Sequence, residues 1–325
     1  MLAGIYAGPT LVYALAISIL QFSVSCEGEI YSFYIDEISR LISDGERLSS
    51  GEYGGFYFSA TLVFIYVACI LGFLYSLIAI SKELQGQDFY IFCSVACMFS
   101  GIGMAALVLL PNIVTLCVVE LYFRTPLNLI GELQDLALGG RQLFKDTFLV
   151  WAFLVGVFIS NLAWWFVAAA GAVALLSKRD DDAQEDAYDL AIRLARVRQI
   201  MYAAALVLIS NTFCISAWLR WPSSYVHDEV LALQLSGFGA TLSFYYGTTM
   251  TVILGVVFLP VLYILGERSF AVARRQDSLK TFAAQSDWLE AQGLSIDFQA
   301  RLRDLATILA PMLAGSLTDV VDTLT

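Results

Sequence analysis

The segment from Ser236 to Gly266 contains no Asp, Glu, Lys, Arg or His, and this uncharged run most constrains how the chain can fold. At the helical rise, a segment of this length reaches about 46 Å. That length exceeds the hydrocarbon core of a bilayer, which is about 30 Å thick. The segment therefore predicts a membrane-spanning helix.

Small residues recur at every fourth position of this segment, and the spacing places them on one narrow face of a helix. In lipid the hydrophobic effect does not draw helices together, so close packing of backbones past small side chains does so instead. We therefore predict that another helix packs against the face formed by Gly239, Ser243, Gly247, Thr251 and Gly255.

The chain is 59% hydrophobic, and its apolar residues form long blocks rather than amphipathic periods. We predict an all-α, polytopic helical membrane protein, because the short alternating segments of a membrane β-barrel are absent from the sequence. The transmembrane domain covers residues 1–266, with six spans at about 3–22, 56–80, 89–119, 148–176, 199–219 and 236–266. Residues 267–325 form a cytoplasmic helical tail in this interpretation.

Basic residues set the orientation, because short cytoplasmic loops are enriched in Lys and Arg. One side of a six-span path holds Arg40, Arg47, Arg124, Arg141, Lys145 and Arg220, and the other side holds all the remaining basic residues, which are more numerous. This bias predicts that both termini are cytoplasmic. Since the sequence shows no targeting peptide, we expect a bacterial inner membrane.

Aromatic residues are expected to mark the outer membrane interface. Phe56, Tyr57 and Phe58 begin the second span, and Trp218 and Trp221 end the fifth. The loop before the fifth span has helical periodicity, so we predict that it continues into that span without a break. It carries Arg193, Arg196 and Arg198, and the segment after the last span carries Arg268, Arg274 and Arg275. These arginines are candidates for contact with lipid or an anionic ligand.

In the tail, the spacing of apolar residues predicts a first helix that ends at Gly293 and a second helix that begins near Ser295. Pro311 is expected to end the second helix, and a final short helix follows it. The apolar faces of these tail helices are too large for the tail to bury alone. They are expected to pack against the cytoplasmic loop, another subunit or a different protein. We predict a homo-oligomer whose subunits touch through Leu302, Leu305, Leu309, Val320 and Val321.

Catalytic chemistry has little support in the sequence. With one histidine, no Walker loop and no carboxylate pair within a predicted span, we expect no enzyme, no metal site and no cofactor. Uncharged polar residues remain, and they either line a narrow aqueous path or simply join helices. They are Asn161, Asn211, Thr212, Tyr245, Tyr246, Thr248 and Thr249.

Two functions remain open. One is an oligomeric ion channel or pore-type effector that is gated from its cytoplasmic side. The other is a non-conducting membrane scaffold or accessory subunit that docks a soluble partner through the C-terminal tail.

The layout of the whole chain, with many spans, a compact cytoplasmic tail and no enzyme motif, resembles the membrane effectors of bacterial anti-phage defence, such as the channel-like subunit of the Hailong type. The resemblance implies antiviral defence, a soluble nucleotide-synthesising partner and an oligonucleotide-type ligand. The net charge of −11 gives no reason to expect duplex nucleic acid.

Overall fold

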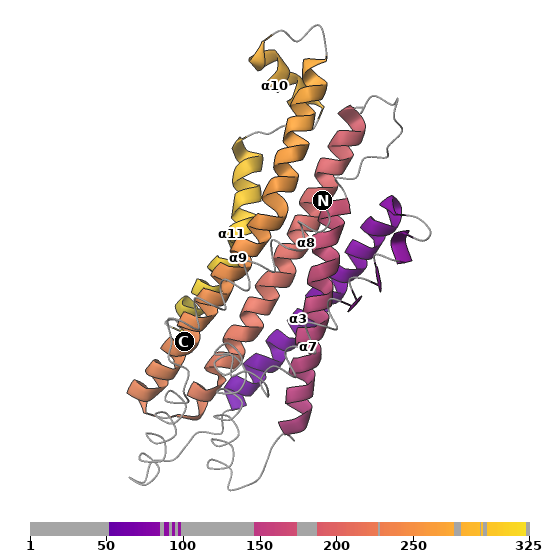
Figure 1. Cartoon of the computed structure of the whole chain (residues 1–325). Helices are drawn as coiled ribbons and strands as arrows, with labels where there is room; N and C mark the ends of the chain where they lie inside the picture. The colour runs from indigo at the N-terminus through magenta and orange to yellow at the C-terminus, as the bar shows by residue number, and fades with distance from the viewer. Residues whose placement is uncertain are drawn as a thin grey trace.

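The computed structural model describes residues 52–84, parts of 88–98, 146–173, 187–226, 228–275, 281–292, 294 and 298–322. Every element of five residues or more in these ranges is helical, which confirms the all-α part of the predicted class. The long helices lie side by side in an elongated bundle (Figure 1). The elements are α3 (Glu52–Glu83), α7 (Asp146–Val173), α8 (Ala187–Arg220), η2 (Trp221–Tyr225), α9 (Glu229–Arg274), α10 (Phe282–Ala291) and α11 (Phe298–Asp322).

Three helical stretches are long and apolar enough to cross a membrane: Phe56–Lys82, Ala187–Tyr225 and Glu229–Arg274. They contain the predicted second, fifth and sixth spans. Helix α7 covers most of the predicted fourth span, and its shorter apolar stretch is Phe158–Ala168. The predicted first span and most of the third lie outside the described residues, so the number of six spans stays a prediction.

Helices α8 and α9 form an antiparallel hairpin. Helix α8 is continuous from Ala187, which confirms that the helical loop runs into the fifth span. After Arg220 the chain makes one short 3₁₀ helix that has Pro222 in its first turn, where a missing backbone N–H costs little. Asp228 then caps α9, since its side chain accepts a hydrogen bond of 2.7 Å from the Leu231 N–H.

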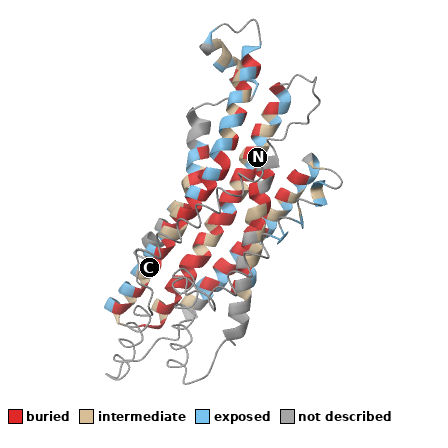
Figure 2. Cartoon of the chain, in the orientation of Figure 1, coloured by how far each residue is buried: buried red, intermediate tan, exposed pale blue. Residues whose placement is uncertain are grey.

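The core follows the inner faces of α8 and α9, where the buried residues of Figure 2 form a nearly continuous band. Leu254, Phe258 and Leu265 of α9 are fully buried in the same hydrophobic cluster as Ile200 and Met201 of α8. Helix α9 continues through Pro260, which is exposed.

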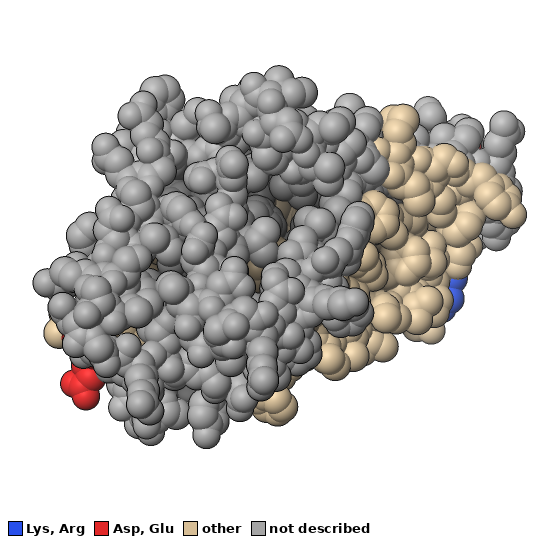
Figure 3. Space-filling model, turned by 90° about the horizontal axis from the view of Figure 1, so that it is seen from below, with Lys and Arg blue, Asp and Glu red and all other residues tan. Residues whose placement is uncertain are grey.

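Aromatic rings fill the end of the bundle where α8 turns into α9. The Phe58 ring centroid lies 5.2 Å from that of Trp218 and 5.4 Å from that of Trp221, and Phe153 stacks on Trp218 at 4.8 Å. Trp218 and Trp221 are each 3% exposed and packed between helices, so their position at the outer interface stays a prediction. We call the end of the bundle where α8 turns into α9 the aromatic end. Seen from this end, the visible described atoms are almost all uncharged (Figure 3).

The C-terminal part contains two helices. Helix α10 is capped by Thr281, and Leu289 and Leu294 near its end are buried in the core cluster that includes the first turns of α8 and the last turns of α9. Helix α11 continues from Phe298 to Asp322 through Pro311, so the predicted break at that residue is wrong. It packs against α9 and α8.

Candidate functional site

The small-residue face of α9 is buried at all five predicted positions. Its members meet two different helices. Gly239 lies against α8, where an added Cβ would come within 3.2 Å of the Leu219 carbonyl. Gly247, Thr251 and Gly255 meet α11 of the same chain.

Helix α11 approaches α9 backbone to backbone. A Cβ on Gly247 would lie 2.5 Å from the Pro311 carbonyl oxygen, and a Cβ on Gly315 would lie 2.9 Å from the Ser243 carbonyl oxygen. Only glycine permits such an approach on either side. Ile308 of α11 lies near Gly255, so α11 runs antiparallel to α9, beside it in Figure 1.

A hydrogen bond joins the two helices at the same level. The Met312 N–H donates to Thr251 Oγ1 at 3.1 Å. Proline disturbs the backbone hydrogen bonds of the turn around it, and Met312 directly follows Pro311. The Thr251 hydroxyl therefore contacts α11 at the turn where the backbone hydrogen bonds of α11 are weakened by Pro311. Residues Gly247, Thr251, Pro311, Met312 and Gly315 are called the α9–α11 contact below.

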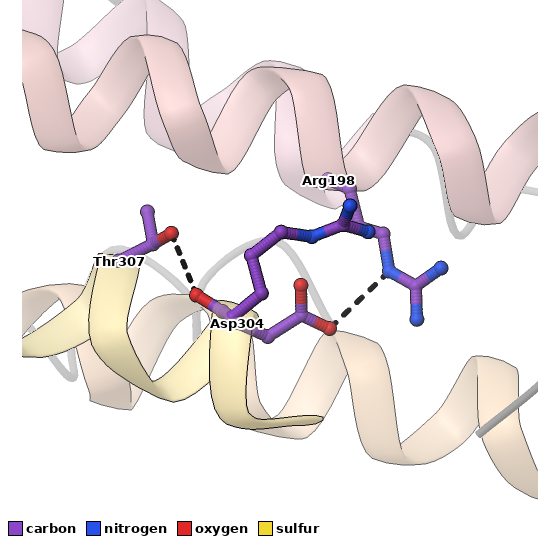
Figure 4. Close-up of polar contacts among 4 residues, drawn as sticks. Arg198, Asp304 and Thr307 are labelled. Carbon is purple, nitrogen blue, oxygen red and sulfur yellow. Dashed lines mark hydrogen bonds and ion pairs between the residues drawn. The ribbon is translucent and has the colours of Figure 1, made fainter. Parts of the chain in front are cut away.

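An ion pair connects α11 to α8. The Arg198 Nε donates to Asp304 Oδ2 at 3.2 Å, and the two side chains are 16% and 12% exposed (Figure 4). The other carboxylate oxygen, Asp304 Oδ1, is buried and accepts no hydrogen bond from the described residues. The Arg303 guanidinium lies 5.9 Å from the centre of the Tyr202 ring, one turn along α8 from Arg198.

The predicted ligand-contact arginines gather at one end of the bundle. Tyr75 of α3 donates a hydrogen bond of 2.6 Å to Gln199 of α8, so the C-terminal end of α3 lies beside the N-terminal part of α8. The antiparallel α9 brings its own C-terminal end to the same place. We call this the basic end; it carries Lys82, Arg193, Arg196, Arg198, Arg268, Arg274, Arg275 and Arg303, with the acidic residues Asp189, Glu267 and Asp304 among them.

The pore-lining candidates make contacts that join helices or close on their own backbone. Asn211 Nδ2 donates to Tyr246 Oη at 2.5 Å between α8 and α9. Thr212, Thr248 and Thr249 donate to carbonyls one turn earlier in their own helices. Tyr245 is half-buried, and the side chain of Asn161 lies outside the described residues.

The predicted oligomerisation residues lie on α11. Leu305 is 48% exposed and Leu309 is half-buried, whereas the side chains of Leu302, Val320 and Val321 lie outside the described residues. Helix α11 has partners within its own chain, namely α9 and α8. The need for a partner is thus partly met inside the chain, and subunit contact through α11 stays a prediction.

Sequence reasoning missed Asp304, Met312 and Gly315, and it read Pro311 as a break. One signal was present: residues 305–318 contain no charge, and Gly315 lies one turn after Pro311. Small residues one turn apart in an uncharged helix are typical of membrane helix contacts.

Among the described residues there is no group of three or more His, Cys, Asp or Glu that could hold a metal ion. Comparison with family descriptions, curated proteins and solved structures finds no match to this chain.

Proposed function

We propose that this chain is a channel- or pore-type membrane effector whose conduction is controlled by the position of α11. The observation that carries the proposal is the Arg198–Asp304 ion pair, which ties α11 to α8 at the basic end. A ligand or partner that binds the arginines there would act on the same group of charges.

The α9–α11 contact supports a two-state arrangement. Packing across Gly247 and Gly315 depends on close contact, so a small shift of α11 would lose many contacts at once. The Asn211–Tyr246 hydrogen bond joins α8 to α9 beside Gly247. Movement of α11 along α9 would therefore change the geometry of this hydrogen bond.

In the full proposal the protein is a six-span homo-oligomer of a bacterial inner membrane, with the basic end in the cytoplasm. A role in anti-phage defence, with an oligonucleotide-type ligand made by a partner enzyme, belongs to the same proposal. Its support is the layout of the chain and the gathering of arginines, which suit an anion.

The alternative, a non-conducting scaffold, uses the tail as a docking surface for a soluble protein. Part of that surface is engaged elsewhere, because Ile308, Pro311 and Gly315 pack on α9. This packing favours the pore over the scaffold.

Planar-bilayer recordings of the purified full-length chain test the proposal. If the ion pair holds the closed state, Asp304→Asn should raise the open probability without added ligand. Thr307→Val is the matched control, because Thr307 Oγ1 donates only to the Arg303 carbonyl of its own helix at 2.8 Å (Figure 4). Absence of conduction in both the wild type and Asp304→Asn would remove the pore and leave the scaffold.

A further inference from the structure

Helix α8 provides landmarks for depth in the membrane. Arg198 and Arg220 bracket a stretch that contains no charged residue, and the distance between them along the helix is about 33 Å. This distance is close to the thickness of a hydrocarbon core. We therefore take Arg198 and Arg220 as the landmarks for the two edges of the bilayer.

Helix α11 can be placed against these landmarks. Asp304 pairs with Arg198, so this part of α11 lies at the basic edge. Pro311 meets Gly247, and the neighbouring Tyr246 bonds to Asn211, which lies near the middle of the α8 stretch. Pro311 is therefore near mid-bilayer. Gly315 meets Ser243, which is further toward the aromatic end.

The remaining turns of α11 continue in the same direction. From Asp304 to Asp322 the helix rises about 27 Å, which is most of the distance between the two edges. Residues 305–318 are uncharged, and the acidic residues Asp319 and Asp322 come only in the last turns. Charged residues thus flank an uncharged run on both sides, as in a membrane-crossing helix, although this run is shorter than that of an ordinary span.

The hydrogen bonding around Pro311 is consistent with a position inside the hydrocarbon core. In hydrocarbon a weakened backbone hydrogen bond cannot be replaced by water, so neighbouring helices supply the partner. Thr251 Oγ1 accepts from Met312 N–H beside Pro311. At the surface of a soluble tail, water would fill that role without any contact from α9.

We infer that α11 is itself a membrane helix, which crosses the bilayer alongside α9 so that Asp322 emerges on the side opposite α10. The small-residue face of α9 is its binding surface. Under this inference residues 298–322 are not part of a cytoplasmic tail, and the soluble region at the basic end is reduced to α10 and its flanking segments. The inference stands whether or not the chain conducts ions.

If α11 crosses the bilayer, it places acidic residues within the membrane region. Helix α11 brings Asp304 to the basic edge of the membrane and Asp319 into the half near the aromatic end, whereas the six predicted spans contain no acidic residue. Among the described residues the buried Asp304 Oδ1 has no hydrogen-bond partner, so removal of Arg198 would leave this carboxylate without compensation.

The test is sided labelling of the full-length chain with a membrane-impermeant maleimide, in a background without native cysteines. Ser286→Cys on the exposed face of α10 reports one side, and Asp322→Cys at the end of α11 reports the other. Labelling of the two from opposite sides of sealed vesicles is expected. Labelling from the same side, or labelling of Asp322→Cys only after detergent is added, would overturn the inference.

A second measurement avoids removal of the native cysteines. An epitope tag is placed after Thr325 in the wild-type chain, and protease is added to right-side-out and inside-out vesicles. The tag should be lost in the vesicle orientation that protects a second tag inserted after Gln276. Loss of both tags in the same orientation contradicts the crossing of α11. Neither measurement depends on conduction, so this inference and the proposed function fail separately.

Discussion

Gly247 of α9 faces the carbonyl of Pro311 so closely that a Cβ on the glycine would lie 2.5 Å from that oxygen. The neighbour is backbone rather than the flexible end of a side chain, so it cannot move aside without moving α11. The two residues are far apart in the sequence, and their contact fixes how α11 lies on α9.

Gly247→Ala should therefore destabilise the chain by about 2 kcal/mol, because the two helices must separate to accept the methyl group. A lower melting temperature of the detergent-solubilised protein would measure this loss. Gly237→Ala is the matched control in the same helix, since a Cβ there meets open space among the described residues. It should leave the melting temperature unchanged or raise it, because alanine favours helix over glycine. Equal effects of the two substitutions would contradict the close contact.

Thr251→Val removes the acceptor for the Met312 N–H while keeping the shape of the side chain. Interhelical hydrogen bonds in membrane proteins contribute about 0.6 kcal/mol on average, so we expect a loss of about 1 kcal/mol beside a disturbed proline turn. Thr248→Val should cost less, because its hydroxyl bonds only to the Phe244 carbonyl of its own helix at 2.9 Å. Thermal melting of both variants checks the difference, and an equal loss in the two would show that the bond to α11 contributes nothing.

The class of fold could be predicted from the sequence because uncharged runs and helical periodicity are properties of single segments. The continuity of α8 and the burial of the Gly239 to Gly255 face followed from the same local patterns. The partner of that face did not, because a stripe of small residues specifies close packing without naming the helix that packs. Gly239 meets α8 and Gly247 meets α11, and no residue pattern within α9 distinguishes the two.

The role of α11 was missed for a related reason. Its uncharged stretch is shorter than that of an ordinary span, and Pro311 breaks helices in water. Contact with Thr251 lets the helix continue through the proline, which is a tertiary effect. The tryptophans at the end of α8 show the same limit: aromatic residues near a helix end are typical of an interface belt, and that pattern does not reveal that neighbouring Phe58 and Phe153 enclose them here.

The Arg198–Asp304 pair should show coupling in a double-mutant cycle. Removal of either charge leaves the other in a mostly buried position, so Arg198→Met or Asp304→Leu alone should each cost about 3 kcal/mol. The double variant Arg198→Met/Asp304→Leu should recover much of this loss, since two apolar side chains replace two charges. Additive losses, measured by thermal or chemical unfolding in detergent, would mean that the two charges do not interact.

The last prediction concerns the aromatic end, where Phe58 is fully buried between Phe153, Trp218 and Trp221. Phe58→Ala should open a cavity among α3, α7 and α8 and lower the stability by about 3 kcal/mol. Phe56→Ala, two residues earlier in the same helix, is the control because its ring is 79% exposed. Truncating that ring removes contacts with the surroundings rather than with neighbouring helices, so its melting temperature should stay near the wild-type value. Because the cluster joins three helices, Phe58→Ala should also quench or shift the tryptophan fluorescence of the folded protein. Unchanged emission together with an unchanged melting temperature would show that the rings do not pack as described.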